Sequence, residues 1–191
     1  MLDLKVYNQL KPTKGKVLIT EPFLEDEYFE RSIILLCEHN EDGSFGFVLN
    51  HYTDVKLDDI SDFTGYETKI SIGGPVGKQQ LYFIHTLGEQ IEGAITIIPG
   101  LFVGGDFEQL KKQVNLGLVK DDQIRFFIGY SGWTKGQLEN ELKENAWLVS
   151  EIIDIPRLMN CHNDKLWEQY MSHQGGKYKA FAQFPTNHKL N

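Results

Sequence analysis

The chain has 191 residues, of which 41% are apolar and 12% aromatic, and a net charge of −8. This length suits one domain with a substantial core, and the composition is that of a globular protein and not a disordered one. Residues 17–172 carry 26 acidic and 12 basic residues, a net charge of −14. A body this acidic repels phosphate groups, so direct nucleic-acid binding is not expected. The basic ends, residues 1–16 and 173–191, are interpreted as solvated termini.

Neither a leader nor a membrane span is visible in the sequence. The first 19 residues lack the basic start, apolar region and cleavage site of a signal peptide. The longest apolar run, residues 33–37, is too short to cross a bilayer. We therefore expect a cytoplasmic protein with no membrane partner. Cys37 and Cys161 are expected to be reduced thiols, Cys37 buried in a strand and Cys161 more exposed.

Strand patterns dominate the chain. Residues 16–20 predict a first strand, and residues 31–38 and 45–50 predict a hairpin around an Asp-Gly turn. Further strands are predicted at residues 80–86, 94–98, 101–103 and 123–128.

Helices are fewer. Asp106, with Gln109 three residues later, predicts a capped helix that ends near Leu116. Thr134 and Gln137 predict a second helix, to about residue 145, and residues 163–173 a third. Because strands outnumber helices and do not alternate with them, we predict a single α+β domain over residues 1–191.

Residues 129–133 predict a turn between a strand and a helix. Their pattern approaches the G-x-S-x-G elbow of hydrolases, but Trp133 stands where the last glycine belongs. The favoured interpretation is a glycine-rich turn that presents Trp133 to a core or groove. The alternative is a small hydrolase-like enzyme centred on Ser131, with His39 or His85 as its base.

Other chemistry finds little support in the sequence. The glycines match neither the dinucleotide-binding motif nor the phosphate-binding loop, so no cofactor is expected. Cys37 and His39 would share one face of a strand, but the spacing of the possible ligands matches no known metal motif. We expect no metal site.

Glycines at three strand ends, residues 73–75, 104–106 and 129–132, suggest a shared surface with the loop at residues 39–40. Glycine weakens a strand, and close approach of a ligand or a neighbouring loop would offset that loss. The alternative, that each glycine serves its own turn, stays open. The candidate cleft consists of His39, Asn40, Gly73, Gly74, Gly105, Asp106, Tyr130, Ser131 and Trp133.

Within this cleft each residue type has an expected role. Tyr130 and Trp133 would supply an apolar wall, whereas Asn40, Asp106 and Ser131 would supply polar contacts. Such a mixture is typical of sites for small molecules or peptides.

An ordered set of segments comprises residues 31–40, 46–50, 73–76, 104–107, 127–133 and 136–147. Together these segments resemble the YqgE/AlgH family of bacterial proteins. The resemblance covers about residues 15–160, and residues 161–191 match only loosely. His51 and Tyr52 stand where the family usually has Arg-Pro, so an anion contact through that arginine has no counterpart here.

The resemblance implies a compact α+β domain of coiled, partly split mixed β-sheets with a few flanking helices. It also carries the label of transcriptional regulator, but transfers no catalytic residue or cofactor. The chain shows no helix-turn-helix pattern, and its body is acidic. We therefore expect a non-catalytic binding or regulatory protein that acts through a protein partner or a small-molecule ligand. The oligomeric state is left open.

Overall fold

The computed structural model describes residues 10–24, 26 and 28–184. The outer parts of the two basic ends, including Lys5 and Lys189, lie outside this range. The strands are β1 (Val17–Thr20), β2 (Ile33–Asn40), β3 (Gly43–Val48), β4 (Tyr52–Thr53), β5 (Ile70–Ile72), β6 (Val76–His85), β7 (Ile95–Ile98), β8 (Leu101–Val103), β9 (Ile124–Thr134) and β10 (Trp147–Ser150).

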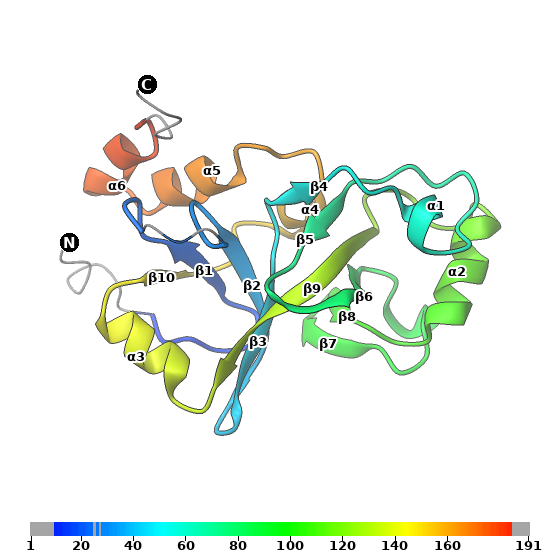
Figure 1. The fold of residues 1–191 in the computed structure, drawn as a ribbon, viewed down its shortest axis with the longest axis horizontal. Helices are drawn as coiled ribbons and strands as arrows, with labels where there is room; N and C mark the ends of the chain where they lie inside the picture. The colour runs from blue at the N-terminus through cyan, green and yellow to red at the C-terminus, as the bar shows by residue number, and fades with distance from the viewer. Residues whose placement is uncertain (1–9, 25, 27, 185–191) are drawn as a thin grey trace.

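The strands form one ten-stranded sheet in the order β10-β1-β2-β3-β9-β6-β8-β7, with the β4–β5 pair attached beside β9. Neighbours are antiparallel except β5 and β9, which are parallel, so the sheet is mixed. β9 has 11 residues. It runs through both halves of the sheet (Figure 1). Its C-terminal part pairs with β3, and its N-terminal part with β5 and β6. The predicted α+β class, with mixed and partly split sheets, is confirmed.

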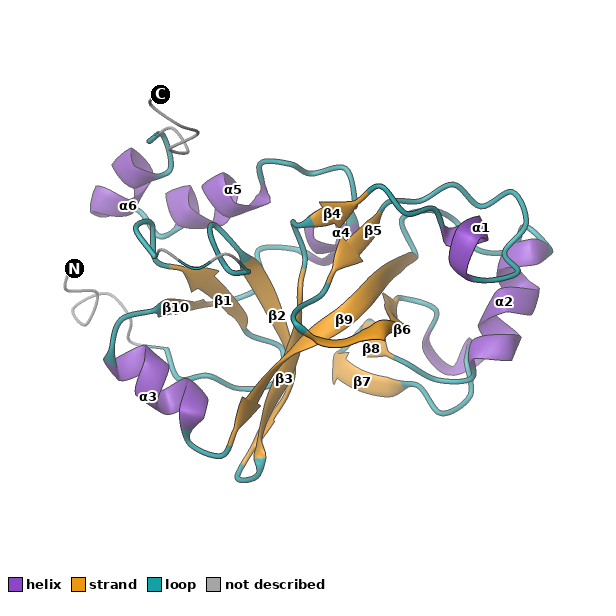
Figure 2. Ribbon diagram, viewed as in Figure 1, coloured by secondary structure: helices purple, strands orange, loops and turns teal. Residues whose placement is uncertain are grey.

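Helices cover the two halves differently (Figure 2). α1 and α2 lie beside the half built around β6, whereas α3 and the α5–α6 pair lie on opposite faces of the other half. A short 3-10 turn spans Gly88–Gln90. The helices are α1 (Leu57–Ile60), α2 (Phe107–Asn115), α3 (Gln137–Lys143), α4 (Ile155–Met159), α5 (Leu166–His173) and α6 (Gly176–Phe181).

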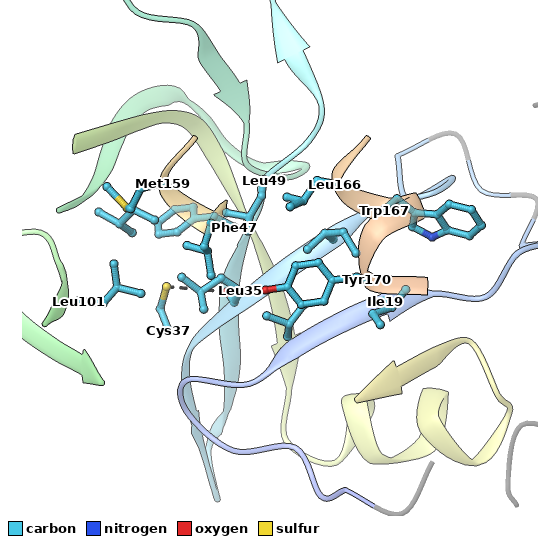
Figure 3. Close-up of a cluster of buried hydrophobic side chains, with 14 of the residues drawn as sticks. Ile19, Leu35, Cys37, Phe47, Leu49, Leu101, Met159, Leu166, Trp167 and Tyr170 are labelled. Atoms are coloured by element: carbon cyan, nitrogen blue, oxygen red, sulfur yellow. Dashed lines mark hydrogen bonds between the residues drawn. The ribbon is translucent and has the colours of Figure 1, made fainter. Parts of the chain in front are cut away.

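Both faces of β1 and β2 are buried, which explains their unbroken apolar sequences. Side chains of a strand alternate between its faces. Ile19 and Leu35 therefore pack towards Trp167 and Tyr170 of α5, as Figure 3 shows. Their neighbours, such as Leu18, Ile34 and Leu36, pack towards α3 instead.

The predicted positions agree with the structure for most long elements. The capped helix is confirmed: the Gln109 N–H donates to Asp106 Oδ1 at 2.9 Å. Thr134, however, is not a helix cap but the last residue of β9, and its N–H donates to the Gln137 side chain at 3.0 Å. The third predicted helix begins only at Leu166. The sequence patterns missed β4, β5, β10, α1, α4 and α6.

Both cysteines are free, and both are buried. Cys37 lies in the main core, where its thiol faces the Leu35 carbonyl at 3.8 Å, and burial raises its pKa. The expectation that Cys161 is more exposed is wrong: only 3% of its surface is accessible. Its sulfur lies 3.6 Å from Thr68 Oγ1, a contact between distant parts of the chain that local sequence does not reveal.

Arg125 of β9 is fully buried and links four parts of the fold. Its guanidinium donates to the Leu158 carbonyl of α4 at 2.7 Å, to Ser71 Oγ of β5 at 2.7 Å, and to the Leu49 carbonyl that follows β3. Among the described residues no carboxylate lies within ion-pair distance of it. Burial lowers the pKa of Arg125, but arginine stays charged in proteins.

Replacing Arg125 with methionine should lower the free energy of unfolding by about 2–4 kcal/mol, measured by urea denaturation. Methionine fills similar space but donates no hydrogen bond, so the buried Leu158 carbonyl loses the donor that Arg125 supplies. Lys120→Met, at an exposed position, is the matched control and should change stability by no more than about 0.5 kcal/mol. Some buried charges can be replaced by apolar side chains without loss of stability. An Arg125→Met protein as stable as the wild type would show that Arg125 is such a case and would contradict its stabilising role.

Candidate functional site

A cleft of about 670 Å³ opens where the β2–β3 hairpin and the end of β9 meet the start of β6. In Figure 1 the hairpin and the end of β9 project at the lower edge of the sheet. The volume lies within the range of small-molecule sites. The residues that line the cleft are Glu38, Asn40, Asp42, Gly43, Ser44, Phe45, Phe47, Val76, Tyr82, Tyr130, Gly132, Trp133 and Thr134.

Four aromatic rings that contact one another form the floor of the cleft. Phe45 lies 6.0 Å from Phe47 and 6.2 Å from Tyr130, measured between ring centroids. Tyr82 closes the set, at 5.8 Å from Phe47 and 5.6 Å from Tyr130. Phe47 is fully buried and the other three are half-buried, so the rings fix each other's positions while Phe45, Tyr82 and Tyr130 keep part of their surface exposed.

Strand register explains why these rings share one face. Phe45 of β3 pairs with Gly132 of β9, and alternation places Phe47 and Tyr130 on the same side. Gly132 has no side chain to cover the floor: a Cβ there would lie 3.2 Å from the Tyr130 ring and 4.0 Å from Val76. The glycine therefore keeps the cleft open.

The other glycines serve close contact between chain segments. Gly129 has φ +70°, and a Cβ there would lie 2.6 Å from the Gly74 carbonyl oxygen. At Gly74, φ is +153° and a Cβ would lie 2.3 Å from the Tyr130 carbonyl carbon. Residues 73–74 can thus cross residues 129–131 only with glycine at positions 74 and 129. These glycines support the cleft wall without lining the cleft.

Acidic and amide groups form the rim. The Asn40 amide donates to the Glu38 carboxylate at 2.6 Å, and the Asp42 N–H donates to Asn40 Oδ1 at 2.9 Å. All three side chains are exposed. Among the described residues, the lining includes Glu38 and Asp42 but no lysine, arginine or histidine. The cleft thus combines an aromatic floor with a negatively charged edge.

His39 and Trp133 point to the opposite face of the sheet, towards α3. The Trp133 indole donates to the Glu141 carboxylate at 2.8 Å, and the Trp147 indole donates to the same oxygen at 2.7 Å. A ring nitrogen of His39 lies 2.7 Å from Ser44 Oγ. Trp133 therefore borders the cleft through its backbone, while its indole packs in a core.

Ser131 does not lie in a turn. The prediction of a turn at residues 129–133 is wrong, because β9 continues through them to Thr134. The Ser131 side chain is fully buried, and its hydroxyl donates to the Gly73 carbonyl at 3.0 Å. The two histidines considered as bases have other partners: His39 contacts Ser44, and His85 contacts Gly104 and Leu87.

The segment around Gly105 lies away from the cleft. A Cβ on Gly105 would meet Ile91 at 2.7 Å, and the Asp106 N–H donates to the Glu92 carbonyl at 2.7 Å. The structure therefore brings together two of the three glycine segments, residues 73–74 and 129–132, with the hairpin. Neither Gly105 nor Asp106 lines the cleft.

Sequence reasoning missed most of the residues that shape the cleft. Glu38, Phe45, Phe47, Val76 and Tyr82 were not among the candidates. The aromatic residues at positions 45 and 47 did carry a signal, since alternate positions of a predicted strand share a face. Tyr82 could not be placed, because its approach depends on how β6 pairs with β9.

His51, which replaces the arginine usual in the resembled family, is held by the backbone. Its Nε2 lies 3.0 Å from the Glu30 carbonyl oxygen and 3.4 Å from Ser32 Oγ. Burial lowers the pKa of His51, and the Glu30 contact partly opposes this shift. The position therefore favours a neutral ring and not a fixed positive charge for an anion.

Within the described residues, no group of three or more histidine, cysteine, aspartate or glutamate side chains could hold a metal ion. Of the helices described, none is long and apolar enough to cross a membrane.

The chain is similar to bacterial proteins along most of its length. A family model described as AlgH-like matches residues 17–179. A UPF0301 protein of Bacteroides thetaiotaomicron is 43% identical over 180 residues, which cover 93% of this chain and 91% of that protein. A UPF0301 protein of Chlorobaculum tepidum is 40% identical over 183 residues, which cover 95% of this chain and 96% of that protein.

Two solved structures share the fold. The solution structure of AlgH from Pseudomonas aeruginosa is 25% identical with a TM-score of 0.71, and covers 94% of this chain and 98% of that one. A crystal structure of a Corynebacterium diphtheriae protein has a TM-score of 0.74 at 23% identity, and covers 96% and 100% of the two chains. At 23% identity, the similarity to the Corynebacterium diphtheriae protein concerns the fold alone.

The fold and these matches together define a class of bacterial α+β proteins to which the chain is similar. The chain belongs to the AlgH-like family. The resemblance seen in the sequence is thus confirmed, and it reaches residue 179 and not only residue 160.

His85 offers a test of the structure around the Gly104–Asp106 segment. The Leu87 N–H donates to Nδ1 at 3.2 Å, so the ring proton sits on Nε2 and is donated to the Gly104 carbonyl at 3.0 Å. The ring also stacks on Phe102, with centroids 5.6 Å apart. Protonation of Nδ1 would replace this acceptor with an N–H group that faces the Leu87 N–H inside the core.

Burial lowers the pKa of His85 below its ordinary value, although the Gly104 contact opposes the shift. The unfolded chain therefore takes up a proton first, near pH 6.5, and the stabilising contribution of neutral His85 is lost as pH falls from there through the folded-state pKa. An NMR titration of the His85 ring between pH 8 and 5, in native buffer and in urea, should show the lower pKa in the native protein. A native pKa above the value in urea would contradict the assigned tautomer.

Proposed function

We propose that this protein is a non-catalytic, cytoplasmic binding protein that holds a ligand in the aromatic cleft. The observation that carries the proposal is the floor of four mutually contacting rings, Phe45, Phe47, Tyr82 and Tyr130, beneath an opening kept clear by Gly132. Apolar floors with a few polar groups at the edge are typical of binding sites.

The surroundings of Ser131 favour binding over hydrolysis. A serine nucleophile needs an exposed hydroxyl and a base within hydrogen-bond reach. Here the hydroxyl is buried and donates to the Gly73 carbonyl. Of the two histidines considered as its base, His85 uses both ring nitrogens in contacts with backbone groups. We therefore assign Ser131 to holding residues 73–74 against β9.

The charge distribution favours an indirect role in any regulation. Residues 17–172 carry a net charge of −14, and the rim of the cleft adds Glu38 and Asp42 at its opening. Phosphate backbones are held mainly by lysine and arginine, and neither occurs in the part of the cleft lining that the structure describes. We propose that a regulatory effect passes through a small molecule or a protein partner and not through direct contact with DNA.

Gly132→Val should block the cleft without breaking the fold. Its backbone is not in the left-handed region, and valine suits a strand, so the added methyl groups enter the opening above Tyr130. Fragments that bind the wild type in a ligand-observed NMR screen should bind this variant about tenfold more weakly or not at all. Thr96→Val, at an exposed position of β7 outside the cleft, is the matched control and should bind them normally.

Two outcomes would count against the proposal. Fragments that bind Gly132→Val as tightly as the wild type would place the binding site elsewhere. Turnover of a simple ester that disappears in Ser131→Ala would replace the binding proposal with the hydrolase alternative.

A further inference from the structure

The described residues that line the cleft combine aromatic rings with carboxylates and include no lysine, arginine or histidine. Its floor is Phe45, Phe47, Tyr82 and Tyr130, and its rim carries the exposed carboxylates of Glu38 and Asp42. The faces of aromatic rings carry partial negative charge and attract cations. The floor and the rim therefore both favour a positively charged ligand.

We infer that the cleft binds a small organic cation that carries an alkylated ammonium group. This inference rests on the proposed binding function and names the chemical class of the ligand.

The floor selects an alkylated ammonium over a bare ammonium or a metal ion. A bare cation gives up its water only to oxygen or nitrogen ligands that replace it, and an alkylated one is already apolar at its surface. The partly exposed rings of Phe45, Tyr82 and Tyr130 offer apolar and π-electron contact, and the exposed carboxylates lie at the edge and not on the floor. Consistently, the described residues contain no metal-binding group of three acidic, histidine or cysteine side chains.

The rim adds long-range attraction and not a fixed ion pair. Glu38 is exposed and already accepts a hydrogen bond from Asn40, and Asp42 lies at the tip of the hairpin. Exposed charges act through solvent and are screened by salt. The rim should therefore raise affinity for a cation at low ionic strength, while the rings supply the part of the selectivity that survives added salt.

The test compares choline with 3,3-dimethylbutan-1-ol, in which carbon replaces the ammonium nitrogen. Both are titrated into the full chain while the aromatic NMR signals of the cleft are followed. Choline should bind about tenfold more tightly than the alcohol, as expected for a cation over several rings. Added salt should reduce this preference without abolishing it.

Variants separate the rim from the floor. Glu38→Gln with Asp42→Asn should weaken choline binding by about threefold to tenfold and leave the alcohol unchanged. Glu144→Gln, an exposed acid beside α3 on the opposite face, is the control with no expected effect. Phe45→Leu keeps an apolar floor but removes one ring, and should reduce the ratio of the two affinities. Urea unfolding of each variant confirms that it is folded.

The outcomes distinguish this inference from the function on which it rests. If both ligands shift the cleft signals and bind equally, the cationic preference is wrong and the cleft remains a binding site. If neither shifts them, the inference is overturned whatever the fragment screen shows. If the rim and ring variants bind choline as the wild type does, binding occurs elsewhere and the inference also fails.

Discussion

The fold depends on one strand that serves two halves of a sheet. β9 pairs with β3 at one end and with β5 and β6 at the other, so the side chains along it face three separate cores. Arg125 near its start holds the segments on that side through hydrogen bonds to carbonyl and hydroxyl oxygens. Gly129 in its middle lets residues 73–74 cross at backbone contact. A side chain at position 129 would meet the Gly74 backbone and disturb the join between the halves.

The cleft is a consequence of the same join. β6 follows β9 regularly from Leu81 onward, but the register shifts between Val76 and Leu81, and the intervening residues leave the ladder. Such irregularities bend a strand away from its neighbour. The hairpin pairs with the other end of β9 and runs past this point, so the rings of β3, β6 and β9 meet below an opening that no strand covers.

Local patterns in the sequence predicted the elements that local interactions determine. The capped helix after Asp106 and the hairpin around residues 42–43 depend on neighbouring residues, and both were found. Residues 129–133 were misread because glycine usually indicates a turn, whereas here glycine is required by a segment more than fifty residues away. α6 was missed for a related reason: the last predicted helix stopped at residue 173, before two glycines, yet Gly176 begins a new helix.

The candidate site shows the same limit. Of the candidate residues, Asn40, Tyr130 and Trp133 lie at the border of the cleft, but sequence alone did not show that the Trp133 indole faces the opposite side. Strand alternation would have separated these residues, had positions 129–133 been recognised as part of β9. Gly105 and Asp106 share only composition with the other glycine segments, and composition carries no information about distance.

A rigid floor is well suited to a ligand that makes few hydrogen bonds. Each ring of the floor is held by at least two of the others, and Phe47 also stacks on Phe127 in the core with centroids 4.5 Å apart. Little side-chain freedom is then left to lose when a ligand arrives, and ordering of side chains is a major cost of binding. Weak contacts with aromatic faces can suffice under those conditions. The packing that stabilises the sheet junction therefore also prepares the cleft, and a single set of aromatic residues serves both the fold and the proposed function.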